Sequence, residues 1–267
     1  MHWIVQNDLY SEEGHASLIR ALEVMGLPFS LVKVVPFVHT LEPEPVIASG
    51  SKVIALGAYT LITIARERGW TPGTWDLGPT SELPNQIPHW GARLLNHDAW
   101  IGLLADVPEV NPSTLGGPNV ARPFFLRPLR DSKVFSGKVF DWHEFTEWRA
   151  NLPPDEGHLN LYTPVLIAPR KIIYAEYRTW VVNGRVVTAS QYKSGSTVVY
   201  NADVPEFILD FAQECVNLWS PAPAFVLDVA ETPLGLRIVE TNTLNAAGWY
   251  RGNVGKIVEA LENLEAL

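Results

Sequence analysis

Cysteine is almost absent from this chain. Its 267 residues include one, Cys215, so no disulfide can form within the chain. A chain without disulfides fits a reducing compartment, and we expect a cytoplasmic location. The first residues lack a basic segment followed by an apolar run, which argues against a signal peptide. No apolar run approaches the ~20 residues that a membrane-spanning helix needs, so we expect no membrane association.

An excess of positive charge is also missing. The chain has 20 lysine and arginine residues against 29 aspartate and glutamate residues, a net charge of −9. Overall charge therefore gives no reason to expect sequence-independent binding to nucleic acid. Hydrophobic residues make up 47% of the chain and charged residues 18%, which predicts a sizeable core rather than disorder.

Several short motifs that would decide a function are missing too. The stretch DSKVFSGKVF, residues 131–140, resembles a phosphate-binding loop because it holds two lysines and a glycine. It lacks the first glycine of a P-loop and has Val139 where serine or threonine should stand. No dinucleotide-binding glycine pattern, no nucleophile elbow and no zinc-protease motif occurs elsewhere in the sequence.

The first third of the chain reads as a small open α/β layer over roughly residues 1–75. Strands are predicted at residues 2–6, 29–35 and 52–57, with helices before Gly26 and over residues 58–69. Proline and glycine in residues 71–90 predict a surface connector. Residues 97–106 are predicted to be helical.

The remainder alternates strands and helices differently. Strands are predicted around 120–129 and at 138–140, followed by a helix that begins at Asp141. Asn183-Gly184 between two apolar runs predicts a β-hairpin with a type I′ turn. A helix capped by Asp203, a hairpin over residues 224–242 and a terminal helix complete the chain.

Two carboxylates are predicted to face each other on the late hairpin. A turn near residues 232–236 places Asp228 opposite Glu240, and Asn242 points to the same face. A divalent cation would relieve the repulsion, and an all-oxygen set suits Mg²⁺ or Mn²⁺. We expect Asp228→Asn to abolish turnover while the fold is retained, because no core residue changes. The alternative is a solvent-facing acidic pair on an edge hairpin.

A basic set accompanies this pair. A regular two-residue turn would pair Glu176 with Gln191 and Tyr174 with Lys193, so that one face of the hairpin carries both charge signs. Arg178 lies on that same face.

Two further cations, Arg127 and Lys133, stand before and within the 131–140 loop. Together with Arg178 and Lys193 they form a clamp suited to a polyphosphate. The alternative is ordinary surface charge with local salt bridges.

The segments EYRTWVVNGRVVTASQYK (176–193) and VLDVA…RIVETNTLNAAG (226–248) resemble the ATP-grasp superfamily. Most members have a lysine where Arg127 stands, so the chain is similar to the clade that uses an arginine there. That clade occurs in phages and biosynthetic clusters, and RP…D.K.F.G is its typical form. The resemblance covers residues 95–267.

The resemblance implies an ATP-grasp fold of the α/β (α+β) class, with two α+β subdomains that sandwich ATP. Residues 1–94 would form a small open α/β domain that precedes it. Residues 95–163 would form the N-terminal subdomain with the phosphate loop, and residues 164–267 the C-terminal subdomain with the metal site.

The same resemblance implies roles for single residues. Metal ligands would be Asp228, Glu240 and Asn242. Nucleotide contacts would come from Arg127, Lys133, Leu166, Ile167, Ala168, Glu176, Arg178 and Lys193, the backbone of residues 166–168 reading the adenine edge. Arg178 and Lys193 would also be catalytic.

The implied activity is an ATP-dependent carboxylate–amine ligase with Mg²⁺ or Mn²⁺, acting through an acyl phosphate on small-molecule, amino-acid or peptide substrates. A small-molecule kinase on the same scaffold, a non-catalytic nucleotide-binding module and an unrelated α/β protein remain alternatives. The oligomeric state is open, with a homodimer among the states considered.

Overall fold

The computed structural model describes residues 1–8, 13–35, 37–107, 123–130, 134–153 and 158–264. The chain divides into two compact units: Met1–Gly78 together with Ile173–Leu267, and Pro79–Ile172. The first unit therefore joins the two ends of the sequence. The domain boundaries expected from the sequence, after residues 94 and 163, divide the chain differently and remain a prediction.

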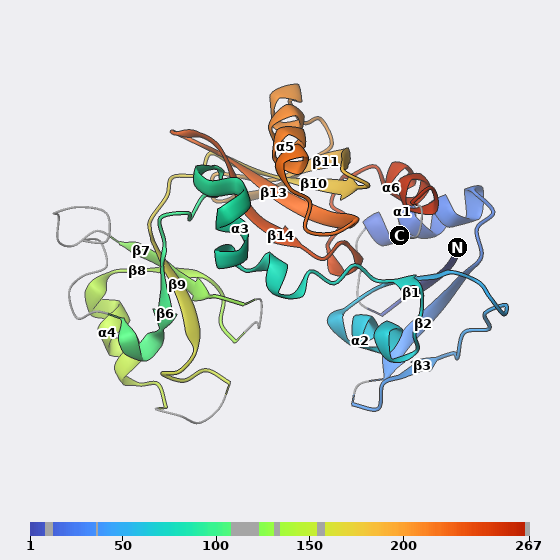
Figure 1. The fold of residues 1–267 in the computed structure, drawn as a ribbon, viewed down its shortest axis with the longest axis horizontal. Coiled ribbons are helices and arrows are strands. Elements are labelled where there is room, and N and C mark those ends of the chain that lie inside the picture. The colour runs from blue at the N-terminus through green and yellow to red at the C-terminus, as the bar shows by residue number, and fades with distance from the viewer. Residues whose placement is uncertain (9–12, 36, 108–122, 131–133, 154–157, 265–267) are drawn as a thin grey trace. The chain divides into compact units, whose positions relative to one another are not determined.

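The N-terminal part of the first unit is the expected α/β layer (Figure 1). Its elements are β1 (His2–Gln6), α1 (Glu13–Val24), β2 (Phe29–Val35), β3 (Thr40–Glu42), β4 (Val53–Leu56), α2 (Tyr59–Glu67) and β5 (Pro72–Gly73). The strand order is β3-β2-β1-β4-β5, and β1, β2, β4 and β5 are parallel. The three predicted strands and both predicted helices are confirmed.

The C-terminal part of this unit is built on a second sheet in the order β12-β11-β10-β13-β14, antiparallel throughout. Its elements are β10 (Ala175–Val182), β11 (Arg185–Ser194), β12 (Thr197–Asn201), α5 (Glu206–Leu218), β13 (Ala224–Thr232), β14 (Gly235–Asn242), a short 3-10 helix at Leu244–Ala246 and α6 (Val254–Glu262). Both predicted hairpins are confirmed. At the first turn Asn183 and Gly184 have φ values of 51° and 70°, as a type I′ turn requires.

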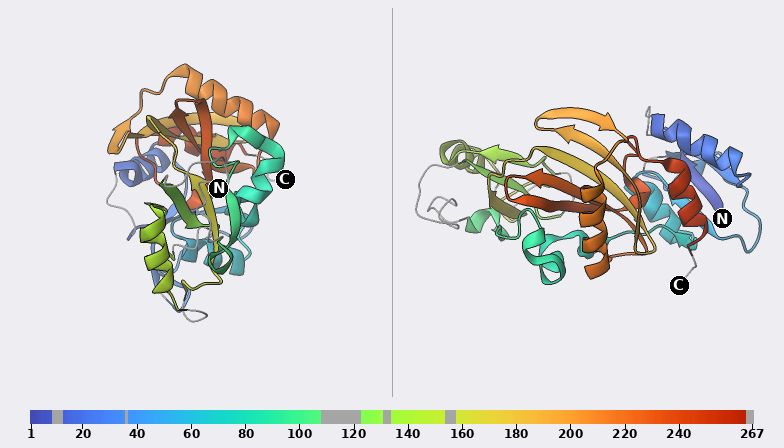
Figure 2. Two further views of the ribbon diagram at one scale, coloured as in Figure 1. Left: turned by 90° about the vertical axis from the view of Figure 1, so that its left-hand side faces the viewer. Right: turned by 90° about the horizontal axis from the view of Figure 1, so that it is seen from above.

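One hydrophobic core spans both parts of the first unit. Trp3 and Leu22 from the N-terminal layer belong to the same buried cluster as Trp180 and Val226 from the second sheet. Helices α1 and α6 pack side by side between them (Figures 1 and 2). The indole Nε1 of Trp3 also donates to the Glu262 carboxylate at 2.5 Å. The N-terminal layer is thus built into the same body as the second sheet.

The second unit holds a four-stranded antiparallel sheet in the order β6-β9-β7-β8. Its elements are a 3-10 turn at Gly78–Ser81 where the unit begins, α3 (Leu83–Trp90), 3-10 turns at Gly91–Arg93 and Leu104–Asp106, β6 (Trp100–Leu103), β7 (Phe124–Pro128), β8 (Lys138–Phe140), α4 (Trp142–Ala150) and β9 (Pro164–Pro169). Asp141 caps α4 as predicted, because its carboxylate accepts the Glu144 backbone N–H at 2.8 Å.

Two sequence predictions in this region are wrong. Residues 97–106 form β6 and a 3-10 turn rather than a helix, because the short apolar run pairs with β9. Such a run is too short for periodicity to separate helix from strand. The expected surface connector contains α3, which tolerates Pro84 in its first turn and buries Leu83 and Trp90.

A capping prediction is also wrong. Asp203 does not cap α5, whose N-cap position is Pro205 and has no side-chain hydrogen bond. At α6, in contrast, the Asn253 side chain accepts the Lys256 backbone N–H at 3.1 Å. One exposed polar residue therefore stabilises a helix that carries part of the shared core, and the other does not.

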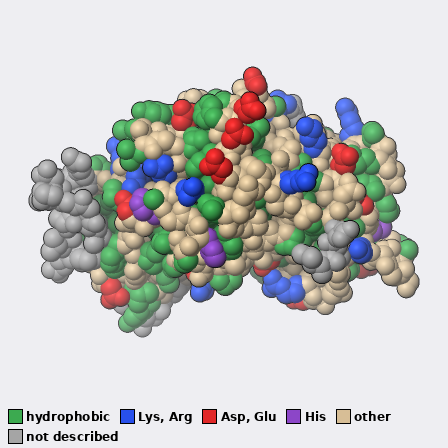
Figure 3. Space-filling view, turned by 45° about the horizontal axis from the view of Figure 1, so that its top comes forward, with side chains coloured by type: hydrophobic (Ala, Val, Ile, Leu, Met, Phe, Trp, Pro, Cys, Tyr) green, Lys and Arg blue, Asp and Glu red, His purple; other side chains and the backbone are tan. Residues whose placement is uncertain are grey.

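The outer face of α5 is acidic. Glu206, Asp210 and Glu214 are exposed and stand four residues apart, so they share one side of the helix. Figure 3 shows acidic side chains gathered over this part of the sheet, with basic side chains scattered on the same face. Among the described residues, no helix combines the length and apolar character needed to span a bilayer.

We predict that Asn253→Ala lowers the free energy of unfolding by about 1 kcal/mol, because α6 loses the side-chain cap at its N-terminus. Asp203→Ala, its matched control in the same unit, should change it by less than about 0.5 kcal/mol. Urea unfolding followed by circular dichroism measures both. Equal losses for the two variants would contradict the capping assignment.

Candidate functional site

One face of the second sheet changes from apolar to polar along two neighbouring strands. On β10 the alternating residues Val182 and Trp180 lie in the core, and Arg178 follows them on the same face. On β13 the core residue Val226 is followed two positions later by Asp228. Arg178 and Asp228 are direct cross-strand partners, so strand register alone brings them together.

Arg178 and Asp228 form a buried bidentate ion pair. The guanidinium donates from Nε to Oδ1 at 2.9 Å and from Nη2 to Oδ2 at 2.8 Å. Asp228 is 1% exposed and Arg178 8%. Burial lowers the pKa of Arg178, but Asp228 outweighs that effect and the pKa is raised overall. Both groups therefore stay charged, and the repulsion expected between two carboxylates is relieved here by an arginine.

The third strand contributes Glu240 and Asn242. As predicted, Glu240 stands opposite Asp228, and the register shifts directly after this pair so that Val229 faces Ile238. The shift makes Val239 an extra residue and puts Ile238 in the core while Glu240 keeps its place beside Asp228.

The side-chain ends of Asp228, Glu240 and Asn242 converge. Nδ2 of Asn242 donates to Glu240 Oε1 at 3.2 Å and lies 3.4 Å from Asp228 Oδ2. A half-turn of the amide would present its oxygen instead and give three oxygen donors. This set fits Mg²⁺ or Mn²⁺, which prefer carboxylate and carbonyl oxygens. Within the described ranges, no three His, Cys, Asp or Glu side chains come together, so the amide is the necessary third donor.

The register predicted for the β10–β11 hairpin is wrong. Glu176 faces Lys193 rather than Gln191, because β11 carries two bulges. One of them leaves Tyr192 as an extra residue between Gln191 and Lys193. Bulges are not visible in a hydrophobic pattern, so the turn alone could not give this pairing.

Glu176 is held from two sides. It is 7% exposed and accepts the Tyr192 hydroxyl at 2.7 Å and the Lys193 ammonium at 2.8 Å. The Lys193 side chain is 39% exposed, so its ammonium reaches the surface. Burial, followed by the charges of Asp228 and Glu176, raises the pKa of Tyr192, which keeps its phenol protonated as a donor.

Aromatic rings beside Arg178 were not predicted. Cζ of Arg178 lies 4.8 Å from the ring centre of Tyr250 and 5.7 Å from that of Tyr192, within cation–π range. The two rings are stacked with centres 5.3 Å apart, and Tyr200 stacks on Tyr250 at 5.2 Å. These tyrosines come from β11, β12 and the loop before α6, so no local sequence pattern connects them.

The remaining predicted residues lie in the second unit. Arg127, on β7, is the cross-strand partner of Leu166 on β9, and Ile167 and Ala168 follow Leu166 in the same buried strand. A Cβ on Gly137 would overlap the Phe125 ring, so the end of the predicted loop packs closely beside β7. Lys133 lies outside the described residues.

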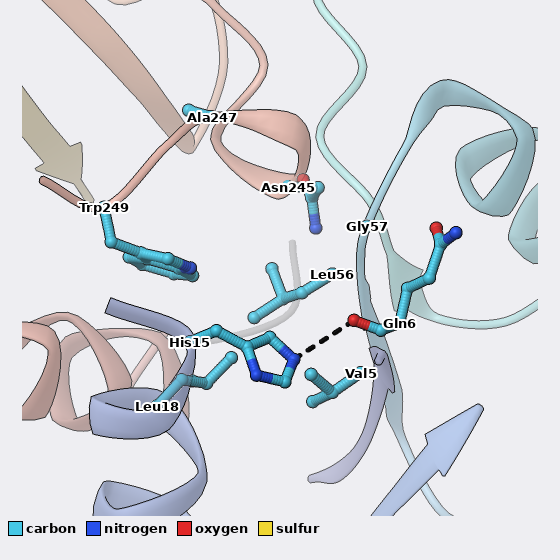
Figure 4. A pocket seen from close by; sticks show the side chains of 9 residues that line it. All are labelled: Val5, Gln6, His15, Leu18, Leu56, Gly57, Asn245, Ala247 and Trp249. Carbon is cyan, nitrogen blue, oxygen red and sulfur yellow. Dashed lines mark hydrogen bonds between the residues drawn. The ribbon is translucent and has the colours of Figure 1, made fainter. Parts of the chain in front are cut away.

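A second location considered was the crevice between β1 and β4, where an open parallel sheet commonly holds ligands. Figure 4 shows a small pocket there, lined by His15, Gln6 and Asn245 among others. Its polar groups are engaged within the protein. Nε2 of His15 contacts the Gln6 carbonyl oxygen at 3.1 Å, and Nδ2 of Asn245 donates to the Ala55 carbonyl at 2.7 Å. We therefore regard this crevice as an internal joint.

A family model described as an ATP-grasp domain, family 3 of its clade, matches residues 50–261, well over half of the chain. The chain belongs to the ATP-grasp superfamily. This confirms the resemblance drawn from residues 176–193 and 226–248, including the clade with an arginine at position 127. No curated protein matches the chain by sequence.

Solved structures agree with this ATP-grasp assignment. The ATP-grasp ligase PsnB complexed with a minimal precursor is 12% identical, with a TM-score of 0.60 and 99% of each chain covered. A RimK domain ATP-grasp protein from Sphaerobacter thermophilus is 14% identical, with a TM-score of 0.61 and 92% of each chain covered. D-alanine–D-alanine ligase from Bacillus anthracis is 13% identical, with a TM-score of 0.61 and 97% of each chain covered.

At these identities the structures show the ATP-grasp fold, which was the predicted fold class. The family match and this shared fold together support an ATP-grasp ligase. The roles of single residues are not decided by either comparison.

The burial of Asp228 changes one expectation. Asp228→Asn was expected to spare the fold, but the carboxylate is inside the protein and balances Arg178. We predict that Arg178→Met lowers the free energy of unfolding by about 3–5 kcal/mol, because it leaves a buried carboxylate without its partner. The double variant with Asp228→Leu should recover part of this loss.

Urea unfolding of the two single variants and the double variant measures this prediction. The control is Arg66→Met, which breaks an exposed pair with Asp76 and should cost no more than about 1 kcal/mol. A loss for Arg178→Met as small as that of the control would show that the pair contributes little to stability.

The raised pKa of Tyr192 has a consequence at high pH. An unfolded tyrosine loses its proton near pH ~10, whereas folded Tyr192 retains it. Its contribution to stability is therefore complete below about pH 10 and declines as the pH rises further. We predict that stability falls less steeply above about pH 10 in Tyr192→Phe than in the parental chain. Parallel curves from urea unfolding at stepped pH would contradict this.

Proposed function

We propose that this ATP-grasp protein is an ATP-dependent carboxylate–amine ligase that forms an amide through an acyl phosphate. The observation that carries the proposal is the convergence of Asp228, Glu240 and Asn242 beside Arg178 on one sheet face of an ATP-grasp fold. Three oxygen-bearing side chains next to a fixed guanidinium suit phosphoryl transfer, in which the protein supplies positioning and charge rather than a nucleophile.

The residues divide into three groups in this proposal. Asp228, Glu240 and Asn242 hold Mg²⁺ or Mn²⁺, which would bridge and neutralise phosphate oxygens of ATP. Arg178 and Lys193 act on the charge that develops during transfer. Both are already oriented by carboxylates, Arg178 by Asp228 and Lys193 by Glu176.

Residues of the second unit would hold the nucleotide. Arg127 and Lys133 bind phosphates, and the β9 backbone over residues 166–168 reads the adenine. On the β6 side the ladder ends at the Trp100–Ile167 pair, whereas on the β7 side it continues through Ala168 and Pro169. The strand end beyond Ile167 is the part of this segment best suited to meet a base.

Two steps follow. First, the bond between the γ-phosphorus and the ADP oxygen breaks as a carboxylate oxygen bonds to that phosphorus. The amine nitrogen then attacks the acyl carbon, the carbon–oxygen bond to phosphate breaks, and the amine loses a proton as phosphate leaves. Arg178 and Lys193 stabilise negative charge in both steps, so no covalent enzyme intermediate is required.

The substrate class we propose is an amino acid or peptide. PsnB was solved with a precursor peptide, and D-alanine–D-alanine ligase is named for an amino-acid pair. The two proteins have the same fold as this chain, which supports both substrate sizes without choosing between them.

The reaction type can be tested without knowing the substrate. The protein is incubated with ATP, Mg²⁺ and pools of amino acids and peptides, with and without hydroxylamine. A ligase gives ADP, a product mass that fits an amide, and a hydroxamate when hydroxylamine intercepts the acyl phosphate. A stable phosphorylated product without hydroxamate would indicate a kinase, and nucleotide binding without turnover a binding module. Either result would overturn the proposal.

We predict that Glu240→Gln lowers turnover at least about 100-fold, because the cation site loses a charge while the core is unaffected. Glu206→Gln makes the same chemical change on the exposed face of α5 and should leave turnover unaltered. Steady-state ADP release at saturating ATP and stepped Mg²⁺ measures both variants. Parental turnover in Glu240→Gln would remove the cation site from this position.

A further inference from the structure

We propose that Tyr192 and Tyr250 are positioning residues that fix the guanidinium of Arg178 for phosphoryl transfer, and that the N-terminal layer acts on the site by holding Tyr250. The inference rests on the proposed function, because it takes Arg178 as the group that meets the transferring phosphoryl. Nothing in the family match or the solved structures assigns a role to either tyrosine.

Tyr192 reaches Arg178 only because β11 is irregular. Tyr192 is the extra residue of a bulge, between Gln191 opposite Tyr177 and Lys193 opposite Glu176. Bulges re-aim a side chain at the cost of ladder hydrogen bonds. The re-aimed phenol donates to Glu176 at 2.7 Å, and its ring lies beside the guanidinium.

Tyr250 depends on a second irregularity. Its φ is 46°, in the left-handed region that a bulky residue seldom adopts. Such conformations persist only where the surroundings enforce them, and they gather at functional sites. Here the result is a ring 4.8 Å from Cζ of Arg178. Two separate backbone irregularities thus bring aromatic rings to one guanidinium.

The N-terminal layer supplies the surroundings that enforce the Tyr250 conformation. Asn245 donates to the Ala55 carbonyl at 2.7 Å and accepts the Trp75 backbone N–H at 2.9 Å, and its own carbonyl accepts from Gly57 at 2.8 Å. Trp249 is 4% exposed and packs so closely on α1 that a Cβ on Gly14 would overlap it. The residue before Tyr250 is therefore fixed against α1.

These contacts leave the guanidinium one free direction of action. Nε and Nη2 are bound to Asp228, whereas Nη1 makes a long contact of 3.5 Å with the Gly248 carbonyl. The two rings restrain the guanidinium against tilting, so Nη1 keeps a constant direction. A misplacement of a charge-stabilising group by about 1 Å can cost on the order of 100-fold in rate.

The test compares an aromatic with an aliphatic replacement in the full chain. Tyr250→Phe keeps the ring and should retain most of the turnover, whereas Tyr250→Leu should lower kcat about 10-fold to 100-fold with a smaller change in KM. The matched control is Tyr200→Leu, which removes the exposed outer ring of the stack and should stay within about twofold of the parental kcat. Thermal unfolding confirms that each variant is folded, and Tyr192→Leu carries the same test if Tyr250→Leu is not.

A double-mutant cycle separates positioning from general destabilisation. In the Arg178→Lys background, Tyr250→Leu should change kcat by no more than about twofold, because the group it restrains is gone. Affinity for ATP, measured by calorimetry on the same four proteins, closes the cycle where turnover is too slow. The positioning role is overturned if Tyr250→Leu matches Tyr250→Phe, or if its loss is the same in both backgrounds. Absence of ATP binding and turnover in the parental chain would instead overturn the proposed function.

Discussion

The bidentate pair between Arg178 and Asp228 is the interaction on which the rest of the site depends. Two charges removed from water are stable only when each satisfies the other with good geometry. Direct pairing of β10 with β13 supplies that geometry, because it sets the two residues opposite each other on one face. The apolar residues before them on the same strands close the core, so the pair marks where the hydrophobic interior ends and the chemistry begins.

Charge balance extends outward from this pair. Asp228 is neutralised by Arg178, and Glu176 by Lys193 together with the Tyr192 hydroxyl. Glu240 adds a further negative charge beside them, and the Asn242 amide faces it. A divalent cation would therefore be drawn to the Glu240 side of the site, while the arginine already present keeps Asp228 ionised inside the protein.

Sequence reasoning reached the parts of this arrangement that depend on turns and periodicity. The Asn183-Gly184 turn and the late hairpin fixed the strands, and Asp228 opposite Glu240 followed from counting outward from the turn. The same counting failed for Glu176 and Lys193, because two bulges shift β11 and a hydrophobic pattern does not record an extra residue. Tyr250 escaped for a related reason, since its direction comes from a positive φ enforced by distant contacts.

The failures elsewhere have a similar physical origin. Residues 97–106 became a strand because β9 offered a pairing edge, which is a tertiary effect that outweighs local preference. The roles of Arg127 and Leu166 rest on resemblance for a different reason. Strand pairing places these two residues together within their own unit, but their function requires a nucleotide that the fold alone does not specify.

The shared core gives the N-terminal layer a physical connection to the chemistry that its small pocket does not. Trp249 packs on α1 in the same cluster that contains Trp3 and Trp180, and Tyr250 follows it directly. Any loosening of α1 must loosen Trp249, and the strained backbone of Tyr250 would then relax toward a commoner conformation. The stability of the layer and the orientation of Arg178 are therefore energetically coupled. Because the contacts run through packed side chains and buried hydrogen bonds, the coupling needs no ligand in the layer itself.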